Sequence, residues 1–63
     1  MKRRELVRRL LELGAILARE GGEHTVYTNP RTGENLSVPR HAEISEHLAR
    51  RLIRDARRLI EDE

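Results

Sequence analysis

Apolar residues recur at helical spacing near both ends of the chain. Over residues 3–13, Leu6, Leu10 and Leu13 form one stripe, with arginine and glutamate on the opposite side. A second stripe, over residues 45–60, consists of aliphatic side chains at the same spacing: Leu48, Leu52, Ala56 and Leu59. The pattern therefore predicts two amphipathic helices, and neither can bury its apolar stripe without another layer of structure.

Between the helices, the pattern predicts three short strands, at residues 15–20, 24–29 and 34–38. Gly21 and Gly22 are expected to supply positive φ for a tight turn between the first two strands. The Asn-Pro-Arg-Thr-Gly segment at 29–33 is typical of a turn, because proline restricts φ and glycine accepts the left-handed conformation. Short turns join neighbouring strands, so the sheet is expected to be antiparallel.

Two residues are expected to cap the helices. Gly14 is expected to end the first helix in the left-handed conformation, and Ser45 is expected to cap the start of the second. The resulting order is α-β-β-β-α, with a three-stranded antiparallel sheet and two helices on one face. This α+β arrangement is the double-stranded-RNA-binding-like fold class.

The composition excludes several classes of protein. The 63 residues suffice for one domain, and the absence of cysteine excludes a disulfide scaffold and a thiolate metal site. No apolar run approaches the ~20 residues of a membrane span, so no membrane association is expected and the cytoplasm is the default location. All but one of the 13 basic residues are arginine, which suits bidentate contact with phosphate or carboxylate.

Basic residues cluster in two segments, 1–20 and 50–58. Such clusters favour a polyanion or an acidic protein as the partner. The alternative is that these charges only keep two amphipathic helices soluble.

His24 is the main candidate for chemistry, because it follows the glycine pair at the start of a predicted strand. Histidine changes charge near neutral pH and suits proton transfer. The alternative is a structural histidine at the rim of the core, because strand alternation places His24 on the same face as Val26.

Four further residues are candidate RNA contacts. Tyr27 can stack on an unpaired base or shield the sheet backbone. Gly22 is primarily expected to form the turn, and as a second role it can let a phosphate approach the backbone closely. His41 follows the third predicted strand and can act as a second acid or contact a phosphate; the alternative is that it is only an exposed loop residue. Arg40 precedes His41 and is also a candidate contact. The three histidines have no known metal-ligand spacing, so neither a metal nor a cofactor is expected.

Nearly the whole chain resembles the HicA-type toxins, small messenger-RNA-cleaving proteins of bacterial and archaeal toxin–antitoxin pairs. The resemblance begins with the opening helix, Lys2-Arg3-Arg4-Glu5-Leu6-Val7, and a Gly-x-His-x-x-Tyr segment at Gly22, His24 and Tyr27. It continues with a Pro-Gly-containing turn, the sequence Val38-Pro39-Arg40-His41 and a closing amphipathic helix. The resemblance therefore implies a single HicA-like domain over residues 1–63.

The resemblance also implies a function, that of a type II toxin that cleaves messenger RNA as a metal-independent endoribonuclease. It implies His24 as the catalytic residue and a HicB-like antitoxin that blocks the site. Attack by the 2′-hydroxyl would leave a 2′,3′-cyclic phosphate. Glu23 departs from the family pattern, which commonly has serine before the histidine, and a carboxylate at this position repels phosphate.

Two other functions remain compatible with the sequence. The chain can be a non-catalytic RNA-binding module that recognises duplex RNA by shape and charge. It can also be an inactive interaction partner whose arginines contact an acidic protein surface. Salt-sensitive binding without turnover would identify the first function, and binding to protein but not to RNA would identify the second.

Overall fold

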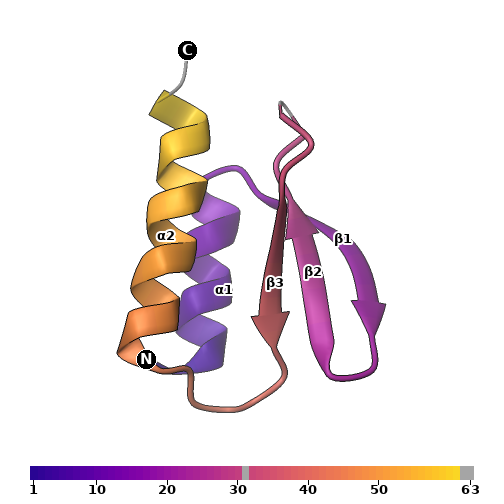
Figure 1. Cartoon of the computed structure of the whole chain (residues 1–63), viewed down its shortest axis with the longest axis vertical. Helices are drawn as coiled ribbons and strands as arrows, with labels where there is room; N and C mark the ends of the chain where they lie inside the picture. The colour runs from indigo at the N-terminus through magenta and orange to yellow at the C-terminus, as the bar shows by residue number, and fades with distance from the viewer. Residues whose placement is uncertain (31, 62–63) are drawn as a thin grey trace.

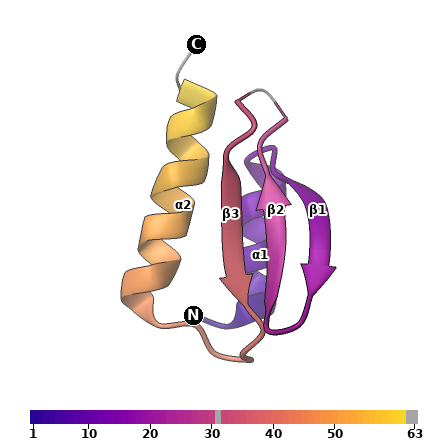
Figure 2. The same ribbon diagram turned by 45° about the vertical axis from the view of Figure 1, so that its right-hand side comes forward.

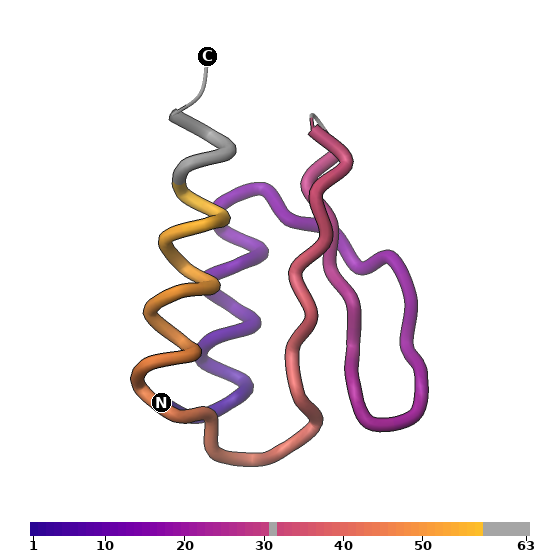
Figure 3. Tube along the Cα trace, in the orientation of Figure 1, coloured from indigo at the N-terminus to yellow at the C-terminus, as the bar shows by residue number. Residues whose placement is uncertain are grey.

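The computed structural model describes residues 1–30 and 32–61 (Figure 1), with side chains described as far as residue 57 (Figure 3). The elements follow in the order α1 (Arg3–Glu12), β1 (Ile16–Gly21), β2 (His24–Thr28), β3 (Asn35–Pro39) and α2 (Glu46–Glu61). The predicted α-β-β-β-α order is therefore confirmed, with small displacements of the element boundaries. Within these described ranges, no helix has both the length and the apolar character needed to cross a membrane.

The three strands form one antiparallel sheet in the order β1-β2-β3, so β2 is the central strand (Figure 1). One face of the sheet packs against the helices, and the side chains that point inward from β2 and β3 are buried: Thr25, Tyr27, Leu36 and Val38. Figure 2 shows α1 behind the sheet, and Figure 1 shows α2 beside α1. The opposite face of the sheet is open to solvent, and we refer to it below as the open face.

The core lies between the helices and the buried face of the sheet. Both helices contribute aliphatic side chains to it: Leu6, Leu10, Ala49, Leu52 and Ala56. Tyr27, the only aromatic residue of the chain, packs in the same cluster. Leu13 and Leu48 are partly buried and pack against this cluster. The two predicted apolar stripes are therefore confirmed, except for Leu59, whose side chain lies outside the described part of the structure.

Leu10→Ala is expected to destabilise the fold strongly, whereas Leu11→Ala is expected to change its stability little. Leu10 is 0% exposed in the core, and its neighbour Leu11 is 48% exposed. Truncation of a buried leucine loses transfer free energy and leaves a cavity, which costs about 2–5 kcal/mol. Urea unfolding of the two variants measures the difference in the free energy of unfolding. Equal losses would contradict the assignment of the α1 face that packs on the sheet.

The predicted helix caps are confirmed. Gly14 follows α1 with a φ of 103°, in the left-handed region. The Ser45 hydroxyl accepts a hydrogen bond from the Leu48 backbone N–H at 3.2 Å, which satisfies one of the free donors at the start of α2. The caps therefore fix where the chain leaves α1 and where α2 begins.

The two turns of the sheet have different backbone conformations. Gly33 has a φ of 78°, as predicted for the turn between β2 and β3, of which residue 31 lies outside the described residues. The prediction of positive φ at Gly21 and Gly22 is wrong, because neither residue has it. Gly21 instead pairs with His24 as the last residue of β1, so only Gly22 and Glu23 remain to form the turn.

Candidate active site

His24 is the first residue of β2 and lies on the open face of the sheet, with its side chain exposed. Val26 shares this face, as strand alternation predicts, and is partly exposed. The buried face carries Thr25 and Tyr27, so the alternative of a core histidine does not fit. No group in the described part of the chain forms a hydrogen bond with the His24 imidazole, so both ring nitrogens are available to a ligand.

An open hollow beside His24 is lined by residues from two segments: Gly22, Glu23, His24, Arg40 and His41. We call it the catalytic hollow because it contains His24, the candidate catalytic residue. The turn between β1 and β2 supplies one side of it, and the segment that follows β3 supplies the other. A backbone hydrogen bond of 3.0 Å, donated by the Arg40 N–H to the Glu23 carbonyl, joins the two segments. The structure therefore brings together four of the five candidate residues.

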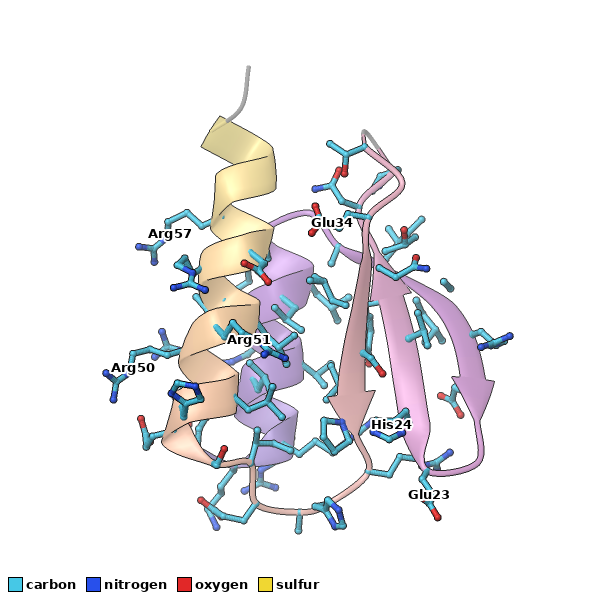
Figure 4. The ribbon with its side chains drawn as sticks, viewed as in Figure 1. Glu23, His24, Glu34, Arg50, Arg51 and Arg57 are labelled. Atoms are coloured by element: carbon cyan, nitrogen blue, oxygen red, sulfur yellow. The ribbon has the colours of Figure 1, made fainter. Side chains whose placement is uncertain are left out.

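The turn at Gly22 and Glu23 leaves room in front of the hollow. A Cβ added at Gly22 would meet no atom within 4 Å, and the backbone there does not take a left-handed φ. Neither crowding nor backbone conformation within this chain requires a glycine at position 22. The space beside Gly22 is therefore free for a ligand. The Glu23 side chain points outward from the turn, whereas His24 lies beside the sheet (Figure 4).

Tyr27 does not join the catalytic hollow. Its side chain is only 7% exposed and packs in the core on the helix side of the sheet. The prediction that Tyr27 stacks on an RNA base is therefore wrong. The alternative, in which Tyr27 shields the sheet backbone, fits this buried position. The physical reason is the two-residue period of the strand, which turns Tyr27 inward when His24 faces solvent.

The segment after β3 is fixed by the first residues of the chain. The Arg3 N–H donates to the Ala42 carbonyl at 2.9 Å, and the Ile44 N–H donates to the Met1 carbonyl at 2.8 Å. The Met1 ammonium lies 3.2 Å from the Glu43 carboxylate, and this hydrogen bond raises the pKa of the amino group above its ordinary value of 8.0. The start of the chain therefore braces the loop that completes the hollow.

The Arg3 side chain binds the two residues next to His24 in the sheet. Its Nε donates to the Pro39 carbonyl at 3.0 Å, and its Nη2 donates to the Thr25 hydroxyl at 2.8 Å. Thr25 follows His24 along β2 and is 1% exposed, while Pro39 pairs with His24 across the sheet. Arg3 therefore holds the end of the sheet that carries His24 against α1.

Arg3→Met is expected to destabilise the protein by about 1.5–3 kcal/mol, because it leaves the buried Thr25 hydroxyl and the Pro39 carbonyl without a charged donor. Arg4→Met is the matched control, since Arg4 is exposed on the same helix turn, and a shift of less than about 0.5 kcal/mol is expected. Denaturant unfolding compares the two variants. If they unfold alike, the two Arg3 hydrogen bonds contribute no specific stability.

Sequence reasoning missed two residues of the open face, Arg19 and Ser37. Both line a second hollow that also includes His24. Ser37 alternates with the two buried residues of β3, so the strand period alone could have placed it on this face. The position of Arg19 could not be found in this way, because β1 departs from regular pairing just before it.

His47 belongs to neither of these hollows. It lies near the start of α2 in a separate depression with one glutamate and three arginines: Glu46, Arg50, Arg51 and Arg54. Figure 4 shows Arg50 pointing away from the sheet. Among the residues that the structure describes, no three histidine, cysteine or carboxylate side chains are grouped as ligands for a metal ion. The three histidines therefore do not form a shared metal site.

The fold and the catalytic hollow define a small α-β-β-β-α protein with a histidine on the open face of its three-stranded sheet. The chain belongs to the HicA toxin family: the family described as "HicA toxin of bacterial toxin-antitoxin" matches residues 3–57 of the 63-residue chain. The match covers all five candidate residues and identifies the chain as a toxin of a toxin–antitoxin system. No curated protein and no solved structure matches the chain.

Proposed function

We propose that this toxin is an endoribonuclease that cleaves messenger RNA at the catalytic hollow, without a metal ion. The observation that carries the proposal is the grouping of His24, Arg40 and His41 around one open hollow in a member of the HicA toxin family. Histidines can move the protons of the reaction, and a guanidinium can bind the phosphate. The cytoplasm, where messenger RNA is translated, is the expected place of action.

The reaction begins with attack of a 2′-hydroxyl oxygen on the adjacent phosphorus. The hydroxyl gives its proton to a base, the O2′–P bond forms, and the bond from phosphorus to the 5′-oxygen breaks. The departing 5′-oxygen takes a proton from an acid, which leaves a 2′,3′-cyclic phosphate and a 5′-hydroxyl. His24 serves as the base or the acid, and His41, on the same hollow, is the candidate for the other group or for a phosphate contact.

Negative charge grows on the phosphate oxygens in the transition state, and donors aimed at those oxygens lower the barrier. Arg40 is the cation of the catalytic hollow and is exposed. The free space at Gly22 lets a phosphate approach the turn backbone closely. Glu23 lowers the positive charge at the rim, and we expect it to weaken phosphate binding relative to the serine that is common in the family.

A HicB-like antitoxin is the proposed protein partner, and it would neutralise the toxin by covering His24. In support, the catalytic hollow is exposed and carries a guanidinium, so an acidic contact surface would complement it. A pull-down with a HicB-like antitoxin candidate tests the pairing. Binding that also stops RNA cleavage supports it, whereas failure to bind counts against the proposed partner.

The test of the proposed function is incubation of the purified chain with end-labelled messenger RNA in the presence of EDTA. Cleavage with 2′,3′-cyclic phosphate and 5′-hydroxyl ends is the expected result. A 3′-hydroxyl product would refute the proposed mechanism. Salt-sensitive binding without any cleavage would instead identify a non-catalytic RNA-binding module.

A further inference from the structure

We propose that Arg19 and Ser37 form a phosphate subsite beside His24, which binds an RNA phosphate next to the one that is cleaved. This inference rests on the proposed function, because it assigns a further contact with the same substrate. Arg19 and Ser37 line the second hollow with His24 on the open face, and neither lines the catalytic hollow. The two hollows share Gly22, Glu23 and His24, so they lie on either side of the proposed catalytic residue.

Arg19 reaches the open face because of an irregularity in β1. Leu17 pairs with Tyr27, and Arg19 pairs with Val26, so Ala18 is an extra residue in the ladder. In a regular ladder, Arg19 would face the same side as Leu17, toward the helices. The extra residue moves Arg19 to the side of Val26, and bulges of this kind often re-aim a side chain beside a functional site.

Arg19 keeps its hydrogen-bond donors available to a ligand. Its side chain is exposed, and none of the carboxylates in the described part of the chain forms an ion pair with it. Arg9, by contrast, is paired with Glu5 at 3.4 Å. An uncompensated guanidinium beside the catalytic hollow favours an anionic ligand, and its forked donors match the geometry of a phosphate.

Ser37 adds a hydroxyl from the other side of the same hollow. It pairs with Val26 across β3 and β2, so Arg19 and Ser37 flank Val26 on neighbouring strands. Guanidinium and hydroxyl groups are common donors to nucleic-acid phosphates. Glu23 also lines this hollow, but its side chain points outward from the turn (Figure 4). An RNA backbone that runs along the open face can therefore place successive phosphates in the two hollows.

The test measures binding of a fluorescently labelled single-stranded RNA by anisotropy, with every variant made in a His24→Ala background to prevent cleavage. Addition of Arg19→Ala is expected to weaken RNA binding about 10-fold. It is also expected to make the plot of log association constant against log salt concentration less steep, by about 0.7 in slope. Ser37→Ala is expected to give a smaller loss without a change in the slope. Arg19→Lys is expected to keep the slope and recover part of the affinity, because the charge remains without the bidentate fork.

Arg57→Ala in the same background is the matched control. It removes the same charge from α2, where Arg57 points away from the sheet (Figure 4), and should weaken binding by less than about twofold. Equal effects of Arg19→Ala and Arg57→Ala would overturn the subsite, because Arg19 would then act only through net charge. The chain with His24 intact is assayed for cleavage in parallel. A lack of cleavage would refute the ribonuclease proposal, while the binding comparison would still decide whether the subsite exists.

Discussion

An RNA with a single 2′-deoxynucleotide on the 5′ side of the cleaved phosphate is expected to resist cleavage completely at that position. The proposed reaction uses the 2′-hydroxyl oxygen as its nucleophile, and the deoxynucleotide lacks it. A neighbouring hydroxyl can have an effective concentration of about 10⁵–10⁸ M, so attack by water would not compensate for its loss. Gel analysis of the substituted RNA beside the all-ribose RNA measures the effect.

The remaining cleavage positions in the substituted RNA serve as the internal control, and they should be cut at the normal rate. The substituted RNA should also bind with nearly unchanged affinity, because its phosphates are intact and phosphate contacts dominate binding. Cleavage at the deoxynucleotide would contradict intramolecular attack. Such cleavage would require an external nucleophile. The catalytic hollow would then need no group that takes a proton from a 2′-hydroxyl.

His24→Ala is expected to lower the single-turnover cleavage rate by about 10²–10⁴-fold, the range typical for loss of a general acid or base. The fold should remain intact, because the His24 side chain is exposed and makes no hydrogen bond within the described chain. Substitution at such a position usually changes the free energy of unfolding by less than about 0.5 kcal/mol. Denaturant unfolding and cleavage assays on the same preparation separate the two effects.

His47→Ala is the matched control for this prediction. His47 is also an exposed histidine, but it lies in the depression on α2 and not in the catalytic hollow. Its replacement is expected to leave the cleavage rate within about twofold of the original, as for surface substitutions away from a site. Comparable losses in the two variants would show that neither imidazole is specific to the reaction. His41→Ala then reports whether the second group of the catalytic hollow takes part in proton transfer or only in binding.

The sequence predicted the elements of the fold because their signals are local. The stripe of Leu6 and Leu10 follows the period of a helix. Gly14 can adopt the left-handed backbone of a C-terminal cap, and Ser45 has a hydroxyl that can cap a helix start. The turn at Gly21 was predicted wrongly, because the pairing register of β1 and β2 decides which residues remain outside the ladder. That register includes an extra residue in β1, which depends on tertiary packing and leaves no clear mark in the local pattern.

The candidate site was predicted in part. Gly22 and His24 are close in sequence, but their proximity to Arg40 and His41 depends on the pairing of β2 with β3. The family resemblance indicated both the segment with Gly22 and His24 and the segment with Arg40 and His41. It did not indicate that the two segments lie side by side. Tyr27 shows the limit of the motif, because the same strand period that exposes His24 buries the tyrosine. The contacts of Arg3 with Thr25 and Pro39 join distant parts of the chain, so no local pattern could indicate them.

The most direct test of RNA binding at the catalytic hollow maps the bound RNA on the protein by NMR. Isotope-labelled protein with all its side chains intact is titrated with a short RNA that carries a 2′-deoxynucleotide at the cleaved position, so that the complex persists. The largest shift changes are expected at Gly22, His24, Arg40 and His41. Shift changes confined to the arginines of α2, with none at His24, would contradict RNA binding at the catalytic hollow.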